Sequence, residues 1–227
     1  MVTTKHVINM KDIAIFGAGG FGREVACIIE QINQVAELDD FRYNLVGFFE
    51  DGGVIGRKIS HFGEVLGGMD ELNAWPTDLA VCIAIGSPNA IRYVRSRITN
   101  QKVTFPNIIH PNFWIVDKQT FNIGQGNIIN SNCKMSVDTS IGDFNILNGY
   151  IVMGHDAKVG NYNVLMPNVR VSGGVHINEG NLLGVSSVVL QQIKIGSGVR
   201  LGAGAILLTK PKDGGVYLGN PAKLFKY

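Results

Sequence analysis

The chain has 227 residues, enough for one large or two small domains, and 45% of them are hydrophobic, which is ample for buried cores. Charged residues make up 17%, the net charge is +2 and no run of like charge occurs, so neither nucleic acid nor a membrane surface is an expected partner. Three cysteines without metal-ligand spacing and a first segment without a signal-peptide pattern favour a cytoplasmic protein that lacks disulfides and structural zinc.

The N-terminal residues predict a small α/β domain. Residues 12–16 (DIAIF) predict a buried strand, residues 17–22 (GAGGFG) fit the pattern GxGxxG, and residues 23–31 predict a helix. In that setting the glycines let backbone N–H groups approach a phosphate, and the helix N-terminus supplies partial positive charge. The alternative is a glycine turn that only packs the helix on the strand.

Two more buried strands are predicted at 45–49 and 79–85, followed by a helix at 89–98, with a polar insertion at 33–44. Ligands of open α/β sheets bind at the carboxyl edge of the strands. The residues predicted to gather there as a substrate pocket are Gly19, Gly20, Phe21, Glu50, Asp51 and Gly86.

The size of this domain bears on its ligand. Only about 100 residues precede the next region, half of a full dinucleotide-binding domain, which disfavours NAD and favours a nucleoside diphosphate sugar. Arg92 on the predicted helix could steer the phosphate, although a solvated surface arginine is the simpler interpretation.

From residue 123 to residue 207 an aliphatic residue or methionine recurs at every sixth position, without exception. The fifteen positions are Ile123, Ile129, Met135, Ile141, Leu147, Met153, Val159, Leu165, Val171, Ile177, Leu183, Val189, Ile195, Leu201 and Leu207. A short fixed period indicates a solenoid in which each repeat buries its apolar face against its neighbours.

Three hexads form one coil, because the pattern of the corner residues repeats every 18 residues. The sequence therefore predicts a triangular prism of stacked parallel strands, with Gly, Asn or Ser at tight corners. Residues 105–119 are expected to form an irregular first coil, in which Phe105 and Pro111 continue the register and Asp117 breaks it. The predicted domains are thus 1–104 and 105–227.

Few titratable residues interrupt the prism, and His155-Asp156 is the outstanding pair. His155 follows the inward Met153 by two positions, so its ring is expected outside the prism at a corner, where it could accept a proton with support from the carboxylate. An exposed corner histidine without a role is the alternative. His110 is expected to be a structural corner residue, His176 to point outward without a catalytic role, and Cys133 to lack anything that would activate it as an acyl carrier.

Three segments resemble one family in the same order along the chain: GAGGFGREVA at 17–26, NGYIVMGHDAKVGNY at 148–162 and VYLGNPAKLF at 216–225. The chain is similar to the sialic acid O-acetyltransferase and bacillosamine N-acetyltransferase family of hexapeptide-repeat sugar acyltransferases. This resemblance implies a Rossmann-like half-domain followed by a left-handed parallel β-helix, a homotrimer, and acetyl-CoA bound in the groove between two prisms.

The resemblance also implies roles for residues. His155 is the expected general base and Asp156 its supporting acid, while Gly173 offers a backbone N–H to the oxyanion. Two positions depart from the family pattern, since Asn163 and Phe21 stand where many members carry histidine. The expected cofactor-binding residues are Asn163, Gly173, Val185, Ala203, Asn220 and Lys223, and no metal is expected.

The function implied is acetyl-CoA-dependent N-acetylation of a nucleotide-linked 4-amino-4,6-dideoxy sugar for surface glycans. Sialic-acid-type O-acetylation and a non-catalytic trimeric scaffold that binds nucleotide sugars remain open. A zinc lyase on the same prism would need three histidines around one metal, whereas the prism contains only His155 and His176.

Overall fold

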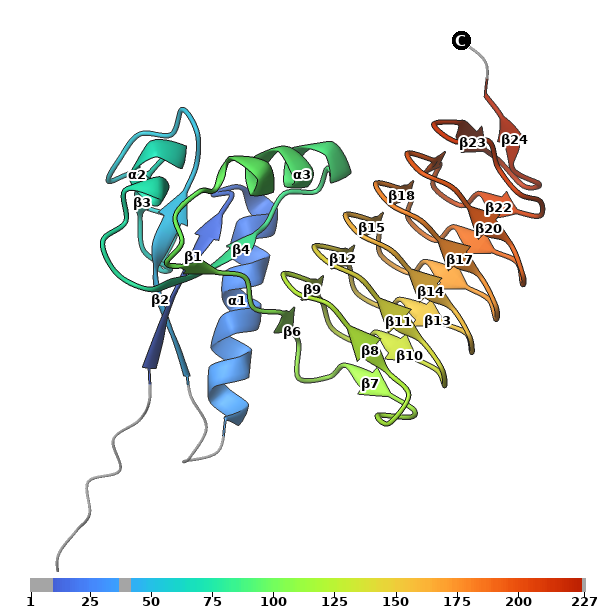
Figure 1. Ribbon diagram of the computed structural model, residues 1–227, viewed down its shortest axis with the longest axis horizontal. Helices are drawn as coiled ribbons and strands as arrows, with labels where there is room; N and C mark the ends of the chain where they lie inside the picture. The colour runs from blue at the N-terminus through green and yellow to red at the C-terminus, as the bar shows by residue number, and fades with distance from the viewer. Residues whose placement is uncertain (1–9, 37–41, 226–227) are drawn as a thin grey trace, which may run out of the picture. The chain divides into compact units, whose positions relative to one another are not determined.

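A computed structural model describes residues 10–36 and 42–225. The chain divides into two compact units, the first comprising Met1–Ile85 with Val94–Pro111 and the second Gly86–Tyr93 with Asn112–Tyr227. The longer segment of the second unit begins at Asn112, and the sequence analysis placed the start of the second domain at residue 105. The elements of both units are labelled in Figure 1.

The first unit is built on a five-stranded parallel sheet in the order β3-β2-β1-β4-β5. Its strands are β1 (Met10–Phe16), β2 (Arg42–Phe49), β3 (Val65–Gly67), β4 (Leu79–Ile83) and β5 (Val103–Thr104). Its helices are α1 (Gly20–Val35) and α2 (Met69–Asn73), and the stretch up to Pro111 also holds β6 (Ile108–Ile109). The division between the units falls within α3 (Pro88–Arg97), after Tyr93.

The register of the central strands brings their carboxyl ends to one edge of the sheet. Phe16 at the end of β1 pairs with Phe49 at the end of β2 and with Ile83 at the end of β4. All residues of β4 are apolar and buried, as expected for a central parallel strand that is covered on both faces. The predicted carboxyl edge therefore exists and carries the loops that follow these three strands.

Helix α1 and strand β2 are both longer than the sequence indicated. The predicted polar insertion at 33–44 is wrong at both ends, because Asn33 lies in α1 and β2 begins at Arg42. The Asn33 side chain explains this: its Oδ1 accepts the Tyr43 N–H and its Nδ2 donates to the Tyr43 carbonyl, each at 2.8 Å. Residues 37–41 of that insertion lie outside the described part.

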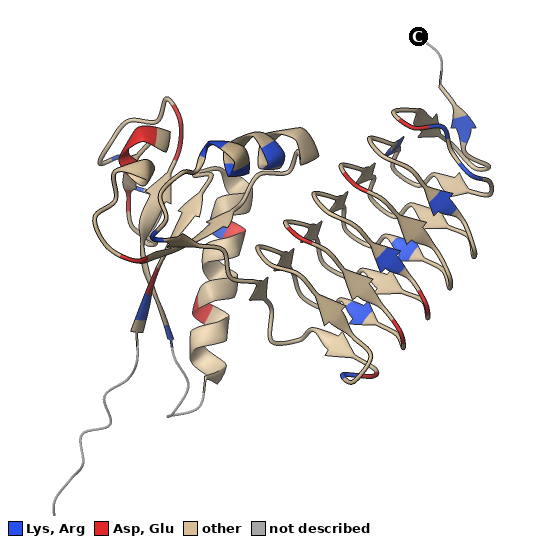
Figure 2. Ribbon diagram, in the orientation of Figure 1, with Lys and Arg blue, Asp and Glu red and all other residues tan. Residues whose placement is uncertain are grey.

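The second unit is a triangular prism of two- and three-residue strands, and Figure 2 colours the positions of its charged residues on the ribbon. We call its three sides the first, second and third face. The first face holds β7 (Trp114–Ile115), β10 (Lys134–Met135), β13 (Val152–Met153), β16 (Arg170–Val171), β19 (Val188–Val189) and β22 (Ile206–Leu207). The second face holds β8 (Asn122–Ile123), β11 (Ser140–Ile141), β14 (Lys158–Val159), β17 (His176–Ile177) and β20 (Lys194–Ile195). The third face holds β9 (Ile128–Ile129), β12 (Ile146–Leu147), β15 (Val164–Leu165), β18 (Leu182–Leu183), β21 (Arg200–Leu201), β23 (Val216–Leu218) and β24 (Lys223–Leu224).

The residues that recur at every sixth position of the sequence are the inward-facing residues of the strands. All of the predicted inward positions are buried except Ile123, which is half-buried in the first coil. From Ile123 onward, strand partners on the three faces lie 18 residues apart up to Leu207, as in Ile123↔Ile141 and Val189↔Leu207. The predicted fold class, an α/β half-domain followed by a parallel β-helix, is confirmed.

The first coil is irregular as predicted, but its register differs from the predicted one. The 18-residue register places Asp117 opposite Met135, but Ile115 of β7, twenty residues before Met135, supplies the inward side chain there. Two extra residues are accommodated at the corner, where the Asp117 carboxylate accepts the Gln119 N–H at 2.9 Å and the Thr120 hydroxyl at 3.0 Å.

A ladder of buried asparagines runs along the corner between the second and third faces. It consists of Asn127, Asn145, Asn163 and Asn181, all fully buried. Each Oδ1 accepts the backbone N–H of the residue one coil further on, at 2.7–2.9 Å, and each Nδ2 donates to a neighbouring carbonyl. The ladder satisfies backbone groups that the sharp corner would otherwise leave unpaired.

Candidate active site

The glycine loop after β1 has the geometry of an anion-binding turn. Gly17 has φ +118° and Gly22 packs directly on it, because a Cβ on Gly22 would lie 1.9 Å from the Gly17 carbonyl oxygen. Gly19 caps α1 without a side chain, and the space about Gly19 and Gly20 is nearly open. The first N–H groups of the 16-residue helix α1 are thus unobstructed at Gly19 and Gly20, and a phosphate could approach them.

Glu50 and Asp51 lie at the carboxyl end of β2, as predicted, but both carboxylates already have partners. Glu50 pairs with Arg57, while Asp51 Oδ1 accepts the Met69 N–H at 2.8 Å and so caps α2. Asp51 Oδ2 also lies 3.7 Å from Arg97. These two acids therefore organise the carboxyl edge of the sheet through contacts with Arg57, Met69 and Arg97.

A cavity of about 270 Å³ lies beside these acids. Glu50 and Asp51 line it together with Gly68, Glu71 and Arg97, which the sequence analysis missed because α2 is too short to give a periodic signal. The glycine loop is not part of its lining. Gly86 stands in the loop between β4 and α3 with open space about its Cα, and Phe21 is half-buried in the first turn of α1.

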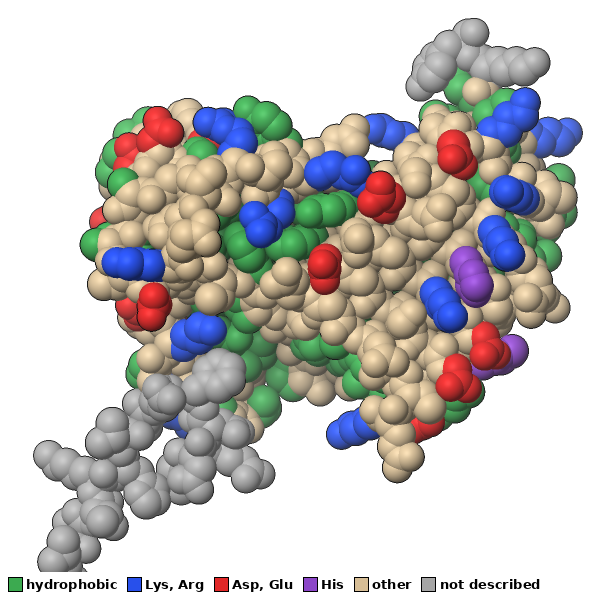
Figure 3. Space-filling model, viewed as in Figure 1, with side chains coloured by type: hydrophobic (Ala, Val, Ile, Leu, Met, Phe, Trp, Pro, Cys, Tyr) green, Lys and Arg blue, Asp and Glu red, His purple; other side chains and the backbone are tan. Residues whose placement is uncertain are grey.

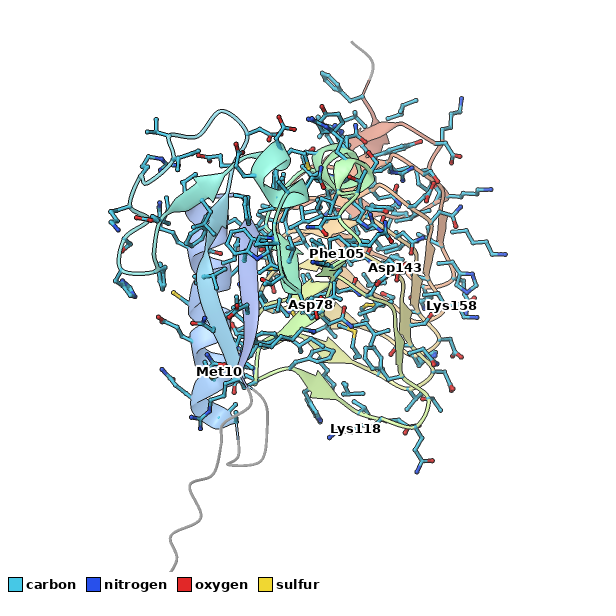
Figure 4. All side chains as sticks on the ribbon, turned by 60° about the vertical axis from the view of Figure 1, so that its left-hand side comes forward. Met10, Asp78, Phe105, Lys118, Asp143 and Lys158 are labelled. Carbon is cyan, nitrogen blue, oxygen red and sulfur yellow. The ribbon has the colours of Figure 1, made fainter. Side chains whose placement is uncertain are left out.

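A cavity of about 650 Å³ opens at the opposite edge, beside Met10, Lys11, Asp78 and Lys102 (Figure 4 labels Met10 and Asp78). Open parallel sheets bind ligands at the carboxyl edge of their strands. The smaller cavity at Glu50 and Asp51 is for that reason the better substrate site.

His155 and Asp156 form the corner between β13 on the first face and β14 on the second. His155 Nδ1 lies 2.7 Å from Asp156 Oδ2, and the two side chains are 62% and 63% exposed. A carboxylate accepts in such a contact, so Nδ1 donates, and in the neutral imidazole the free lone pair is then on Nε2. Asp156 has φ +58°, the left-handed conformation that Asp tolerates better than most residues.

Gly173, one coil beyond His155, forms the floor under the imidazole. A Cβ at this position would lie 2.5 Å from His155 Nε2 and 2.7 Å from Cε1, so only glycine admits the observed ring position. Within the described part of the chain the Gly173 N–H has no hydrogen-bond partner, whereas its carbonyl accepts the Gln192 N–H at 3.0 Å. The N–H is therefore available beside Nε2.

Replacement of Gly173 by alanine is expected to displace the His155 ring without straining the backbone. Misplacement of a reacting group by about 1 Å costs on the order of 10²-fold in rate, so kcat should fall by about that factor while the melting temperature stays unchanged. A Gly173→Ala enzyme with the wild-type kcat would show that the ring does not need this floor.

Two of the residues predicted to bind the cofactor, Val185 and Ala203, lie on another corner of the prism. Val185 and Ala203 stand between the third and first faces, on the turns that lead into β19 and β22, and both are exposed. Asn220 and Lys223 are exposed in the C-terminal hairpin of β23 and β24. Within one chain, the whole first face separates Val185 and Ala203 from His155 and Gly173.

Asn163 requires a correction. It was predicted to contact the cofactor, but it is fully buried in the asparagine ladder. Its Nδ2 donates to Asn145 Oδ1 and to the Asn178 carbonyl, and its Oδ1 accepts the N–H and the Nδ2 of Asn181. All four hydrogen-bonding positions of the amide are used, so none is left for a cofactor.

The other candidate side chains are placed as follows. His176 on β17 faces outward on the second face, between Lys158 and Lys194, and Figure 3 shows histidine beside lysine side chains on the prism surface. Burial lowers the pKa of His110. Arg92, considered as a phosphate ligand, instead lies 5.0 Å from the Tyr162 ring centroid and 3.4 Å from the Glu179 carboxylate.

The thiol of Cys133 is buried and donates to the Asn148 carbonyl at 3.3 Å. Burial raises the pKa of Cys133 to about 11 and that of Cys82 to about 12, so both stay as unreactive thiols at neutral pH. We expect iodoacetamide to label only the exposed Cys27 in the native protein, and all three cysteines in denaturant, as read by peptide mass mapping. Labelling of native Cys133 would contradict its placement.

In the described ranges no cluster of three or more His, Cys, Asp or Glu side chains is arranged to hold a metal ion. Over the same residues, no helix has the length and apolar character needed to cross a membrane.

Comparison with known proteins identifies the class first. The family model of the PglD N-terminal domain matches residues 12–101. WeeI from Acinetobacter baumannii AYE shares 25% sequence identity with a TM-score of 0.82, over 96% of this chain and 100% of that one. Residues 12–101 are thus similar to a PglD-type N-terminal domain, and they are followed by a β-helix, in line with the predicted resemblance.

Two further structures share this architecture. PerB from Caulobacter crescentus, solved in complex with CoA and GDP-perosamine, is 22% identical with a TM-score of 0.81, over 95% of this chain and 97% of that one. The acetyltransferase domain of PglB from Neisseria gonorrhoeae FA1090, solved with acetyl coenzyme A, is 23% identical with a TM-score of 0.69, over 96% and 100%. A comparison with curated protein sequences gave no match.

Proposed function

We propose that the protein is a cytoplasmic acetyl-CoA-dependent N-acetyltransferase that acts on a nucleotide-linked 4-amino-4,6-dideoxy sugar for surface glycans. The observation that carries this proposal is the exposed His155–Asp156 pair above Gly173, with a 2.7 Å contact, on the fold shared with PerB and the PglB acetyltransferase domain. The complexes of those two proteins with CoA, acetyl coenzyme A and GDP-perosamine support the choice of donor and acceptor.

The reaction is a direct transfer. The acceptor amine attacks the thioester carbonyl, and His155 Nε2 takes a proton from the nitrogen as the C–N bond forms. The Gly173 N–H donates to the oxyanion of the tetrahedral intermediate. As the C–S bond breaks, the imidazolium returns its proton to the departing sulfur, which gives the N-acetyl sugar and CoA thiol.

Asp156 positions the base. Its carboxylate holds Nδ1–H and so keeps the free lone pair on Nε2, which faces Gly173. In the first unit, the N-terminal turn of α1 at Gly19, Gly20 and Phe21 would receive the phosphates of the acceptor. The edge at Glu50, Asp51 and Gly86 would receive its nucleoside.

The donor site needs a second copy of the chain. His155 and Gly173 lie on one side of the first face, and Val185 and Ala203 on the other, so a neighbouring prism must bring its own Val185 corner to this His155 corner. The first face suits such contact: Val152, Val188 and Ile206 point outward from it, and Leu190 and Leu208 are exposed beside it. We propose a homotrimer, with acetyl-CoA in each of its three grooves and Asn220 and Lys223 at one end. Light scattering should give three times the 24.6 kDa chain mass.

The activity is tested by incubating the protein with acetyl-CoA and a panel of GDP-, UDP-, dTDP- and CMP-linked 4-amino sugars, GDP-perosamine among them. Release of free CoA thiol together with a mass increase of one acetyl group on the sugar is the expected result. Acetylation of a CMP-linked or free sialic acid hydroxyl would favour O-transfer instead. Binding of a nucleotide sugar without any binding of acetyl-CoA by calorimetry would favour the non-catalytic scaffold.

A further inference from the structure

The corner that carries His155 has two consecutive glycines one coil further on, Gly173 and Gly174. Side chains from the neighbouring coils occupy the space that side chains of these glycines would fill. The His155 ring lies over Gly173 from the N-terminal side, as described above. The Gln192 carboxamide lies over Gly174 from the C-terminal side, where a Cβ would be 2.5 Å from Gln192 Nε2 and 2.8 Å from Gln192 Oε1.

The backbone fixes the imidazole and this carboxamide to one corner. Asp156, Gly174 and Gln192 occupy the same position in successive coils, with φ of +58°, +67° and +64°. The Gly174 N–H donates to the His155 carbonyl at 2.8 Å, and the Gln192 N–H donates to the Gly173 carbonyl at 3.0 Å. The Cα atoms of adjacent residues are about 3.8 Å apart. The ring over Gly173 and the carboxamide over Gly174 therefore lie against neighbouring points of the chain.

The fold makes no use of the Gln192 carboxamide. All four hydrogen-bonding positions of the Asn163 amide are occupied, whereas the Gln192 side chain is exposed and forms no hydrogen bond with any residue that the structure describes. A carboxamide can accept the N–H of a secondary amide or donate to its carbonyl. The corner thus presents an amide-binding group next to the proposed base.

The height of Gln192 along the prism matches that of the proposed donor residues. Strand partners lie 18 residues apart in these coils, so height rises with residue number, and Gln192 lies between Val185 and Ala203. A cyclic trimer of parallel prisms keeps these heights. When the Val185 corner of one copy meets the His155 corner of the next, Gln192 therefore faces the level of the groove through which the donor passes.

We infer that Gln192 binds the pantetheine amide closest to the thioester of acetyl-CoA, by accepting its N–H at Oε1. This inference rests on the proposed function and adds a donor-binding residue to it. An ethylene group separates that amide from the sulfur. With the acyl oxygen at the Gly173 N–H, the pantetheine chain leaves the sulfur towards later coils, and its first N–H comes over Gly174, where the carboxamide lies.

The decisive variant is Gln192→Gly, because glycine adopts the positive φ of this position readily and only the carboxamide is lost. We expect the Kd of CoA, measured by calorimetry, and the KM of acetyl-CoA both to rise about tenfold, as for the loss of one hydrogen bond. The values of kcat, acceptor KM and melting temperature should stay unchanged. ADP carries the nucleotide part of CoA without pantetheine, so its Ki against acetyl-CoA should also stay unchanged.

The matched control is Gln125→Ala, which removes an exposed glutamine side chain from the corner between the second and third faces and should not alter the Kd of CoA. A fall in kcat with an unchanged Kd for CoA would assign the carboxamide to the oxyanion instead. Wild-type constants in Gln192→Gly would show that the side chain only fills space over Gly174. Either result overturns the inference and leaves the proposed function standing.

The ADP measurement separates a pantetheine contact from damage to the groove. An equal rise in the Ki of ADP and the Kd of CoA would contradict a contact with pantetheine alone. If the wild-type protein binds no CoA, the proposed function and this inference fail together.

Discussion

Replacement of His155 by alanine is expected to lower kcat by about 10³-fold, because positioned general acid–base catalysis contributes roughly 10²–10⁴-fold. The loss should appear in kcat with little change in either KM, since the side chain acts on proton transfer in the transition state. Because the side chain is exposed at a corner and contacts Asp156, the melting temperature and the oligomer should be unaffected.

A second histidine of the prism supplies the control. His176 lies on the same side of the molecule but on the second face itself, between Lys158 and Lys194, and it has no proposed role. His176→Ala should therefore retain wild-type turnover. Full activity in His155→Ala, or an equal loss in His176→Ala, would remove the base from the mechanism proposed above.

Replacement of Asn163 by alanine is expected to lower the free energy of unfolding by about 4 kcal/mol. The substitution leaves the Asn181 N–H, one N–H of the Asn181 amide and the Asn178 carbonyl without partners in a buried corner, and each unsatisfied buried group costs about 1–3 kcal/mol. Urea unfolding, followed by circular dichroism, measures the change.

The same variant separates a structural role from a cofactor-binding role. With Asn163 in the ladder, the protein that remains folded at low temperature should bind acetyl-CoA with unchanged affinity. A weaker affinity for acetyl-CoA with unaltered stability would instead support the role that the family pattern suggested. Asn130→Ala is a suitable comparison, since Asn130 also lies in the prism but is not one of the ladder residues.

The fold of the prism was predictable in detail because one physical rule generates it. A side chain every six residues must enter a core too narrow for anything but aliphatic groups, so positions such as Leu147 and Ile177 repeat visibly. The first coil escaped this rule, because the two residues accommodated near Asp117 shift the register to Ile115. In the first unit, β3, β5 and α2 are too short to show any period.

The contact between His155 and Asp156 was predictable, because the two residues are adjacent in the sequence at a corner of the prism. The prediction that Asn163 contacts the cofactor was wrong because a polar residue at a prism corner can either face a ligand or form internal hydrogen bonds. A single position of the sequence does not distinguish the two. The signal was nevertheless present: Asn127, Asn145, Asn163 and Asn181 recur at the 18-residue period, which indicates stacking. The engagement of Glu50 with Arg57 and of Asp51 with α2 depends on tertiary contacts that no motif contains.

Because a full face of the prism separates His155 from Ala203, the proposed homotrimer should show complementation between defective subunits. In the proposed homotrimer, a subunit that lacks the His155 imidazole and a subunit whose Ala203 corner is blocked would form mixed trimers. A groove of such a trimer is intact where the His155 corner of the second subunit meets the Ala203 corner of the first. Activity would also fade on dilution, as free protomers carry both halves of the chemistry but cannot bring them together.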